Sequence, residues 1–338
     1  MSPERYKPRL GFVGLGWIGR TRLESVVQAH VGEVSALYDV TQEAIEEAQK
    51  LAPKATVFSS FEELLDHDLD GVVIATPNRF HAEQSIAALE RGLAVFCQKP
   101  LGRNAIETSR IVEAARNAER LLGVDLSYRH IAGMQHVNSL VESGALGKVF
   151  AVDAKFHNAY GPDKPWFYDY SLSGGGCVLD LGVHLLDLAL EPLGFPLVAQ
   201  TDGALFSAGR LLAKPIRQVE DFATARIETV DHTTIDLSCS WNLHAGRAAE
   251  IEITFYGTGG GASLRNVDGS FFDFVAERFN GTEKETLCST ADSQWQWGGL
   301  ATTEWARKLA AKELFDPAIE RLITVSQIID HIYGHGGK

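Results

Sequence analysis

The chain has few cysteines, and none of them form a closely spaced motif. Its four cysteines, Cys97, Cys177, Cys239 and Cys288, are far apart in a sequence of 338 residues. No pair has the C-x-x-C spacing of a zinc site or a redox motif. We therefore expect free thiols, no disulfide framework and no bound metal.

Basic charge and long apolar runs are also scarce. The chain has 31 Lys and Arg against 44 Asp and Glu, a formal net charge of −13, which argues against nucleic acid and anionic membranes as partners. The first nine residues lack the apolar core of a signal peptide, and we expect no later apolar run to span a bilayer. These features predict a cytoplasmic protein.

The remaining composition is that of an ordinary globular protein, with 45% hydrophobic and 22% charged residues. A length of 338 residues favours two domains. Up to about residue 125, buried apolar strands alternate with amphipathic helices, which predicts an α/β domain with a doubly wound parallel sheet over residues 1–125. The expected helices of this domain cover residues 20–30, 43–50, 80–91 and 104–119, and a capping box at 60–63 opens another.

The pattern changes after residue 125 to long strands, many of them alternating between apolar and polar residues. This change predicts a second, α+β domain over residues 126–338 with a large, mostly antiparallel open sheet. Its expected strands are 148–158, 219–230, 233–241, 249–257, 262–266 and 270–279. Its expected helices are 134–143, a strong helix from 177 or 180 to 193, and a C-terminal helix from 316 to about 333.

A glycine motif follows the first apolar strand and opens the first helix. Gly14, Gly16 and Gly19, with Trp17 and Ile18 between them, form the G-x-G-x-x-G pattern. The first glycine permits a tight turn, the second lets the backbone approach a pyrophosphate, and the third allows close packing of helix on strand. The helix N-terminus then offers free N–H groups to the anion. This order predicts a Rossmann site for a dinucleotide.

A carboxylate ends the second apolar strand, twenty positions after the last glycine of the motif. Asp39 stands there, where such folds hydrogen-bond the adenosine ribose. A carboxylate repels a 2′-phosphate, and neither Val40 nor Thr41 supplies a compensating cation. We therefore favour NAD over NADP as the cofactor.

Polar side chains follow the next two strands of the expected parallel sheet. One strand stops at Thr76-Pro77-Asn78, with His81 one helical turn later, and the next ends at Gln98-Lys99-Pro100. Ligands of open α/β sheets bind at the carboxyl ends of strands. We therefore expect Thr76, Pro77, Asn78, His81, Gln98 and Lys99 to face the same cofactor crevice as the glycine turn.

The stretch after Gly174-Gly175-Gly176 has an acid and a base at helical spacing. Asp180 and His184 are four residues apart, so in a helix both face the same side, one turn from each other. An isolated pair of this kind is more often a helix cap and a buried core histidine. The dinucleotide motif and the strand-end Lys99 favour the alternative interpretation, an acid/base pair.

In the order in which they occur, these motifs resemble those of the Gfo/Idh/MocA oxidoreductase family, over nearly the full length. The motifs that carry the resemblance are Gly14-x-Gly16-x-x-Gly19, Thr76-Pro77-Asn78-x-x-His81, Lys99-Pro100, Trp166 ahead of Ser173-Gly174-Gly175-Gly176, and Asp180-x-Gly182-x-His184. One departure stands out: the family's usual Glu-Lys-Pro is here Gln98-Lys99-Pro100. Glutamine can still hydrogen-bond a ribose hydroxyl, but it removes a negative charge beside Lys99.

The resemblance implies an NAD-dependent dehydrogenase that acts on a secondary alcohol of a sugar, polyol or sugar-derived substrate. It implies His184 as the general base, Lys99 as the group that stabilises charge on the substrate oxygen, and Asp180 as their orienting partner. It also implies a homodimer or homotetramer. The further residues that we expect to contact substrate are Arg129, His157, Asn158, Tyr160 and Trp166.

Three alternatives stay open at this stage. The chain could be a non-catalytic NAD-binding regulator, which the altered Gln98 keeps in play. It could hold NAD tightly and run a closed redox cycle with a net isomerisation, elimination or glycoside cleavage. A metal hydrolase using His184 and Asp187 is the weakest alternative, because no third ligand stands at a convincing spacing.

Overall fold

The chain divides into two compact units, described here by a computed structural model that covers residues 6–289 and 298–336. The first unit contains residues 6–102, 106–127 and 298–320, and the second contains 103–105, 128–289 and 321–336. The units therefore differ from a simple division at residue 125, because a late segment returns to the first unit.

The first unit is built on a six-stranded parallel sheet, as the alternation of strands and helices predicts. Its strand order is β3-β2-β1-β4-β5-β6, so the order reverses between β1 and β4. Reversal points of this kind leave a crevice at the carboxyl ends of the strands, where ligands bind. The strands are β1 (Arg9–Val13), β2 (Glu33–Tyr38), β3 (Thr56–Val57), β4 (Gly71–Ile74), β5 (Ala94–Cys97) and β6 (Leu122–Val124).

Helices cover this sheet and agree with the predicted ones to within a few residues, apart from one helix that the sequence analysis missed. They are α1 (Trp17–Ala29), α2 (Gln42–Leu51), α3 (Phe61–Leu65), α4 (Asn78–Glu90), α5 (Ala105–Ala118) and α9 (Leu300–Ala310). The predicted cap is present at α3, where the Ser60 hydroxyl accepts a hydrogen bond from the Glu63 N–H at 3.2 Å.

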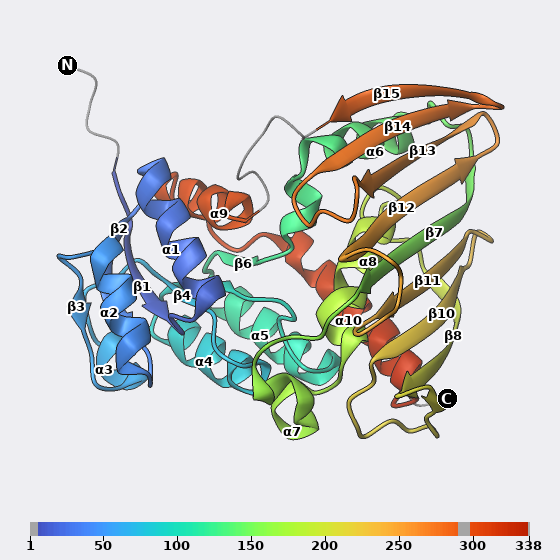
Figure 1. Cartoon of the computed structure of the whole chain (residues 1–338). Helices are drawn as coiled ribbons and strands as arrows, with labels where there is room; N and C mark the ends of the chain where they lie inside the picture. The colour runs from blue at the N-terminus through green and yellow to red at the C-terminus, as the bar shows by residue number, and fades with distance from the viewer. Residues whose placement is uncertain (1–5, 290–297, 337–338) are drawn as a thin grey trace, which may run out of the picture. The chain divides into compact units, whose positions relative to one another are not determined.

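The missed helix, α9, completes the core of the first unit (Figure 1). The Trp305 ring lies 5.7 Å from that of Phe96, and 3% of the residue is exposed. It covers Gly71 and Gly123, where a Cβ would come within 2.9 Å and 2.7 Å of the indole. Glycine on β4 and on β6, the strands on either side of β5, thus makes room for one large side chain. This packing explains why the segment joins the first unit.

The second unit is built on the expected open, mostly antiparallel sheet. Its nine strands lie in the order β15-β14-β13-β12-β7-β11-β10-β8-β9, and only the β7–β11 pair is parallel. Strands β8, β9 and β15 were not predicted from the sequence. The bounds are β7 (Val149–Asn158), β8 (Val198–Ser207), β9 (Arg210–Leu211), β10 (Phe222–Thr229), β11 (Thr234–Ser240), β12 (Ala249–Gly257), β13 (Gly260–Asn266), β14 (Phe274–Asn280) and β15 (Glu283–Ser289).

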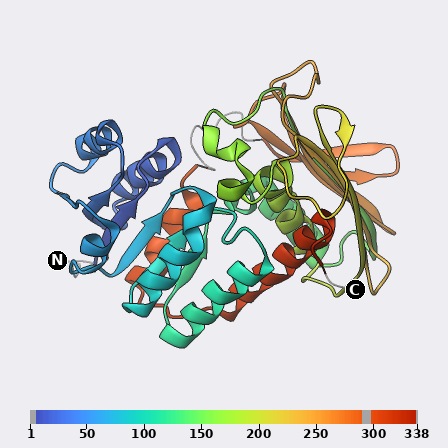
Figure 2. The same cartoon turned by 90° about the horizontal axis from the view of Figure 1, so that it is seen from below.

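Helices lie on one face of this sheet, and no described helix covers the other face (Figures 1 and 2). The longer ones are α6 (Ala132–Glu142), α8 (Val183–Leu190) and α10 (Arg321–Tyr333), and α7 (Tyr170–Ser173) is a single turn. Short 3-10 turns form at η1 (Ser127–His130), η2 (Pro165–Tyr168) and η4 (Pro317–Glu320). The sheet therefore has one packed face and one open face.

The segment that carries Asp180 is a π-helical turn, η3 (Val178–Gly182), which runs directly into α8. The wider π turn changes the spacing expected of an α-helix, and such turns occur frequently at functional sites. Among the described residues, the stretch Tyr170–Leu190 is long and apolar enough to cross a membrane by length and composition, contrary to the sequence-based expectation. It is 83% buried inside the structure, as a core helix is.

Candidate functional site

The glycine turn between β1 and α1 has the backbone geometry that a dinucleotide requires. Gly14 has φ of +83°, and a Cβ there would lie 2.5 Å from the Ala75 carbonyl oxygen. A Cβ on Gly19 would overlap the Gly14 carbonyl oxygen, whereas a Cβ on Gly16 would have no heavy atom within 4 Å. Packing inside the protein thus explains Gly14 and Gly19, and the space at Gly16 fits a bound pyrophosphate.

Asp39 is tied to this turn by its own carboxylate. One oxygen, Oδ2, accepts a hydrogen bond from the Leu15 N–H at 2.6 Å, and the other, Oδ1, accepts one from the Thr41 N–H at 2.8 Å. These bonds hold the end of β2 beside the glycine turn and fix the carboxylate at the edge where the adenosine ribose is expected.

His81 has a positioning role in this structure, unlike the direct cofactor contact expected from the sequence. The residue is 1% exposed, and its two ring nitrogens lie 2.8 Å from the carbonyl oxygens of Pro100 and Thr76. Burial, the largest influence, lowers the pKa of His81, although the two carbonyls act in the opposite direction. The neutral imidazole, which has one N–H, donates to one of these carbonyls and packs against the other, between the segments that follow β4 and β5, and Lys99 directly precedes Pro100.

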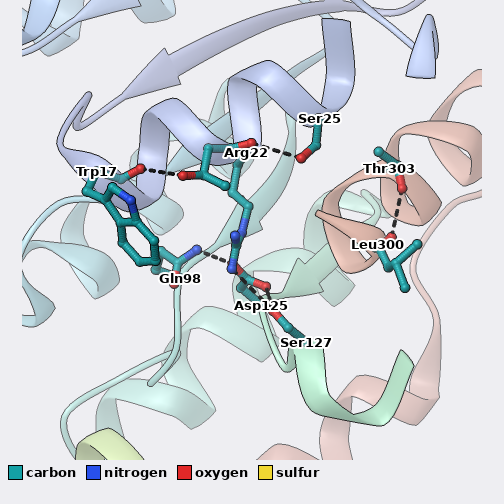
Figure 3. A network of polar contacts seen from close by, with 9 residues as sticks. Trp17, Arg22, Ser25, Gln98, Asp125, Ser127, Leu300 and Thr303 are labelled. Atoms are coloured by element: carbon teal, nitrogen blue, oxygen red, sulfur yellow. Dashed lines mark hydrogen bonds and ion pairs between the residues drawn. The ribbon is translucent and has the colours of Figure 1, made fainter. Parts of the chain in front are cut away.

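Gln98 belongs to a buried polar network, in which it and Arg22 converge on Asp125 (Figure 3). Arg22 Nε lies 2.5 Å from Asp125 Oδ2, and the side chains of these two residues are 3% and 1% exposed. The Gln98 amide and the Ser127 hydroxyl also donate to Asp125. A carboxylate therefore stands next to Gln98, and it is paired with the Arg22 guanidinium.

Asp180 of the second unit is held by a tryptophan. The Trp241 Nε1–H donates to Asp180 Oδ2 at 3.0 Å, and Trp241 is 2% exposed. The His184 ring is buried and makes an edge contact with Tyr128 at 4.9 Å between ring centroids. Both residues expected to handle protons are thus fixed by aromatic neighbours within this unit.

Aromatic residues of the η2 turn extend the surroundings of Asp180. Trp166 stacks on Phe167 at 3.8 Å, and Phe167 and Tyr168 make edge contacts with Trp241 at 6.2 Å and 5.8 Å. Burial and then the charge of Asp180 raise the pKa of Tyr168. In this aromatic group, Trp166, Phe167, Tyr168 and Trp241, the tryptophan at 241 is buried, and the three residues of η2 offer apolar faces near a carboxylate, which suits a sugar ring.

Arg129, which we expected to contact substrate, has structural partners within the protein. Arg129 forms a fork with Asp187, with Nε 2.9 Å from Oδ2, and its Nη1 lies 3.5 Å from Glu191 Oε1. Asp187 is 1% exposed. The geometry therefore assigns Arg129 and Asp187 to a partly buried ion pair, and a metal site using Asp187 finds no support in this arrangement.

His157 lies on the face of the sheet opposite to His184, because alternate residues of a strand point to opposite faces. Its neighbour Phe156 points toward the helices and contacts Tyr128, which in turn contacts His184. The His157 ring nitrogens lie 2.8 Å and 3.1 Å from the hydroxyls of Ser240 and Ser238, and burial lowers its pKa. The substrate contact expected of His157 therefore does not fit its position.

The other residues that we expected to contact substrate remain candidates for that role: Asn158, Tyr160 and Trp166. Asn158 shares the face of Phe156, and its Oδ1 is buried with no hydrogen-bond partner among the described residues. Tyr160 is 54% exposed and lies 5.9 Å from the Phe271 ring. A buried acceptor without a partner is unfavourable unless a ligand or water reaches it, so Asn158 is the strongest of the three.

The sequence analysis missed Trp241 and Phe167. The strand ending at Trp241 was predicted, and the argument applied to Thr76 and Lys99, that strand ends carry functional side chains, would have identified the tryptophan. Phe167 stands between the two aromatic residues that drew notice, Trp166 and Tyr168. Asp125 was predicted only as a domain boundary, although it is the partner of Gln98.

Two family models match the chain, together over more than half of its length. A model described as an oxidoreductase family with an NAD-binding Rossmann fold matches residues 8–126. A model described as the GFO/IDH/MocA C-terminal domain matches residues 134–263. The first match contains all six strands of the parallel sheet, and the second contains the strands of the nine-stranded sheet from β7 to the start of β13.

Curated relatives are dehydrogenases and other oxidoreductases. D-glucoside 3-dehydrogenase of Escherichia coli (strain K12) is 29% identical over 242 residues, covering 68% of this chain and 69% of the relative. Inositol 2-dehydrogenase of Salmonella typhimurium (strain LT2) is 30% identical over 155 residues, covering 45% of this chain and 46% of the relative.

Solved structures share the fold of the whole chain. Levoglucosan dehydrogenase in complex with NADH and levoglucosan superposes with a TM-score of 0.82 at 20% identity, covering 98% of this chain and 97% of the other. A 3-ketoreductase from Actinomadura kijaniata with NADP reaches 0.80 at 20% identity, covering 98% of each chain.

We predict that two single-methyl changes in the glycine turn have separable effects. Gly16→Ala places its Cβ where the pyrophosphate would lie, so it should raise the Kd for NAD by on the order of tenfold without loss of stability. Gly19→Ala should lower the free energy of unfolding by about 1–3 kcal/mol, because its Cβ meets the Gly14 carbonyl. Isothermal calorimetry with NAD and thermal unfolding measure the two quantities. Unchanged NAD affinity in Gly16→Ala would remove the pyrophosphate from this position.

We predict that restoring the family's usual glutamate destabilises this chain. Gln98→Glu puts a second buried carboxylate against Asp125, and should lower the free energy of unfolding by about 3 kcal/mol. The double variant Gln98→Glu/Asp125→Asn keeps one carboxylate near Arg22 and should recover most of that loss. Chemical denaturation of the two variants, with Asp125→Asn alone as the control, measures both effects. Equal stability of Gln98→Glu and wild type contradicts the network.

Proposed function

Because the chain belongs to the Gfo/Idh/MocA oxidoreductase family, we propose that it transfers hydride between NAD and a secondary alcohol of a sugar, polyol or sugar-derived substrate. Membership of this family by itself supports a nicotinamide-dependent oxidoreductase. The observation that carries the cofactor part is the open position at Gly16 in a turn that is otherwise closely packed.

The first unit supplies the groups that would hold NAD. The N–H groups at the start of α1 face the pyrophosphate, Asp39 accepts from the adenosine ribose, and Thr76, Asn78 and Gln98 border the nicotinamide half. Bound NAD supplies the chemistry of accepting or returning a hydride. In this proposal Trp17, 58% exposed at the first position of α1, covers the cofactor at the turn.

The proton chemistry is assigned to His184 and Lys99. His184 removes the hydroxyl proton of the substrate, a task for which imidazole is suited because its ordinary pKa lies near working pH. The Lys99 ammonium donates to the same substrate oxygen and stabilises the negative charge that develops there. Asp180, held by Trp241, orients His184 and favours the cationic imidazole once it has taken the proton.

The substrate class follows from the aromatic group of the second unit. A sugar or cyclic polyol has apolar C–H faces and hydroxyl edges, so it can stack on an indole while its hydroxyls bond to polar neighbours. Trp166, which is only partly buried, supplies such a face, and Asp180 and Asn158 supply acceptors. The relatives named for glucosides, inositol and levoglucosan support this class.

We also propose that the protein is a cytoplasmic homo-oligomer that uses the open face of the nine-stranded sheet. This face has a hollow of ≈ 640 Å³, bordered by opposite charges that include Lys155, Asp202, Arg226 and Asp236. Arg226 and Asp236 pair across neighbouring strands at 2.6 and 2.7 Å. A face of mixed charge can meet its own copy across a two-fold axis. The four free thiols suit a reducing compartment.

We predict activity with NAD and a sugar or polyol that depends on both units. Purified protein with NAD and a panel of aldoses, inositols, sugar acids, a methyl glucoside and levoglucosan should give rising reduced-nicotinamide absorbance with at least one member. His184→Ala should lower turnover by about a hundredfold or more, because the general base is lost, with NAD affinity unchanged. Lys99→Ala should likewise abolish most of the rise.

Turnover near wild type in His184→Ala would end the assignment of the base. No rise with any panel member, despite measured NAD binding, would favour a regulator. Cofactor that survives purification without accumulating in reduced form would favour a closed redox cycle.

We predict that the protein elutes as a dimer or larger oligomer and that the open sheet face is its interface. Ala204→Arg places a bulky cation in the hollow and should shift the mass toward the 36.9 kDa monomer. Ala118→Arg on α5 is the matched control and should leave the mass unchanged. Size-exclusion chromatography with light scattering measures both, and a monomeric wild-type protein would contradict the assembly.

A further inference from the structure

One buried glutamate receives three successive backbone N–H groups at the start of the segment that carries Asp180 and His184. The Glu220 carboxylate accepts from Gly176 N–H and Val178 N–H, both at 2.9 Å. The Glu220 carbonyl accepts from the N–H of the intervening Cys177 at 3.1 Å. Glu220 is 0% exposed, so a single residue satisfies three consecutive donors at the start of the η3–α8 helix.

A tyrosine from the C-terminal helix completes this arrangement. The Tyr333 hydroxyl donates to Glu220 Oε1 at 2.8 Å, and Tyr333 is 2% exposed. A Cβ on Gly175 would overlap the Tyr333 hydroxyl, and one on Gly176 would overlap the Glu220 carbonyl oxygen. The glycines are therefore required because the chain wraps closely around Glu220 and Tyr333.

We propose that Glu220, held by Tyr333, is a positioning residue that fixes the helix start and thereby the placement of Asp180 and His184. This inference rests on the proposed function for the roles of those two residues. The Asp180 N–H donates to the Gly176 carbonyl at 3.1 Å, so the anchored glycine is one hydrogen bond away from Asp180. A carboxylate at a helix start also interacts favourably with the helix dipole.

Glu220 changes its charge near neutral pH, whereas the two groups packed most closely around it stay neutral. Tyr333 of α10, Cys177 before η3, Cys239 of β11 and Tyr170 of α7 face it. Burial raises the pKa of Tyr333 and of Cys177 well above their ordinary values, so both stay neutral. Burial raises the pKa of Glu220 to about 7 from its ordinary 4.5, against the opposing effect of its hydrogen bonds.

This raised pKa gives a stability test that needs no substrate. The folded state binds the Glu220 proton more tightly than the unfolded state, so the stabilisation is complete below about pH 4.5 and is lost as the pH rises through about 7. Across that window the unfolding equilibrium constant of wild type should rise by on the order of a hundredfold relative to Glu220→Gln. Chemical denaturation at intervals from pH 4.5 to 8 measures the difference.

The choice of variants follows from the hydrogen bonds. A glutamine at 220 has one amide N that cannot accept, so it faces either the Gly176 or the Val178 N–H as a second donor. Tyr333→Phe removes a single donor and leaves both backbone bonds. Glu277→Gln is the matched control. Glu277 is also buried, at 4% exposed, and pairs with Arg265 and Lys284. It lies on β14, five strands away from β10, the strand that follows Glu220.

Hydrogen exchange of the full chain, followed by mass spectrometry, tests the anchoring directly. The peptide covering residues 176–184 should exchange about tenfold faster in Glu220→Gln, and to a smaller extent in Tyr333→Phe, at one fixed pH. Glu277→Gln should leave that peptide unchanged. Unchanged exchange in Tyr333→Phe and Glu220→Gln overturns the proposal, and Tyr333→Phe decides alone if Glu220→Gln does not fold.

The pH dependence of kcat/KM separates positioning from a purely structural role. The pH profile is measured with the panel member that wild type turns over. Its acid limb, the fall in kcat/KM toward low pH, should move to lower pH by about half a unit in Tyr333→Phe, because a displaced Asp180 favours protonated His184 less. A variant that only loses folded protein has a lower apparent kcat/KM at every pH, and its acid limb stays in place. Faster exchange with an unmoved limb overturns positioning. If wild type turns over no panel member, the proposed function fails, and the exchange result still decides the anchoring.

Discussion

The buried ion pair between Arg22 and Asp125 is the interaction on which the cofactor edge of the first unit depends. It joins α1, whose first turn follows the glycine motif, to the end of β6, and through Gln98 it reaches the end of β5. Removing either charge alone would leave the other unpaired in the interior, at a cost of about 3–5 kcal/mol. An apolar replacement of both could preserve stability, but it would leave the Gln98 amide without its acceptor. The pair therefore fixes the geometry of the strand ends.

The second unit uses a similar device with backbone donors in place of a guanidinium. Glu220 is as buried as Asp125, and its partners are amides at the start of the η3–α8 helix. In both units a carboxylate that is costly to bury is retained where chain segments must be held in register beside the expected chemistry. The comparison accounts for Gln98 as well: with Asp125 already present, a second acid at position 98 would bring like charges together, so the amide is the compatible residue.

Periodicity and turn residues predicted most of the architecture, because they report which face of each element is buried. The parallel sheet, the antiparallel sheet and the glycine turn follow from local patterns. Helix α9 was missed because its role depends on Gly71 and Gly123, which are distant in sequence and make room for Trp305. The site was harder to predict than the fold. The pairing of Arg129 on η1 with Asp187 on α8 depends on how elements distant in sequence pack together, and the side on which His157 lies depends on which face of β7 the helices cover.

Once the structural partners are assigned, few groups of the second unit remain to distinguish substrates. Arg129 and His157 are engaged by Asp187 and by two serines, so recognition of substrate falls to the aromatic group, Asp180 and Asn158. Three of the four aromatic residues lie on η2, a short turn preceded by a loop, and turns of this kind vary more readily than the strands that support them. Asp180 and Trp241, by contrast, are fixed by the helix start and by β11. In the proposed function, the chemistry is thus placed on rigid elements, and the choice of sugar on a turn that varies more readily.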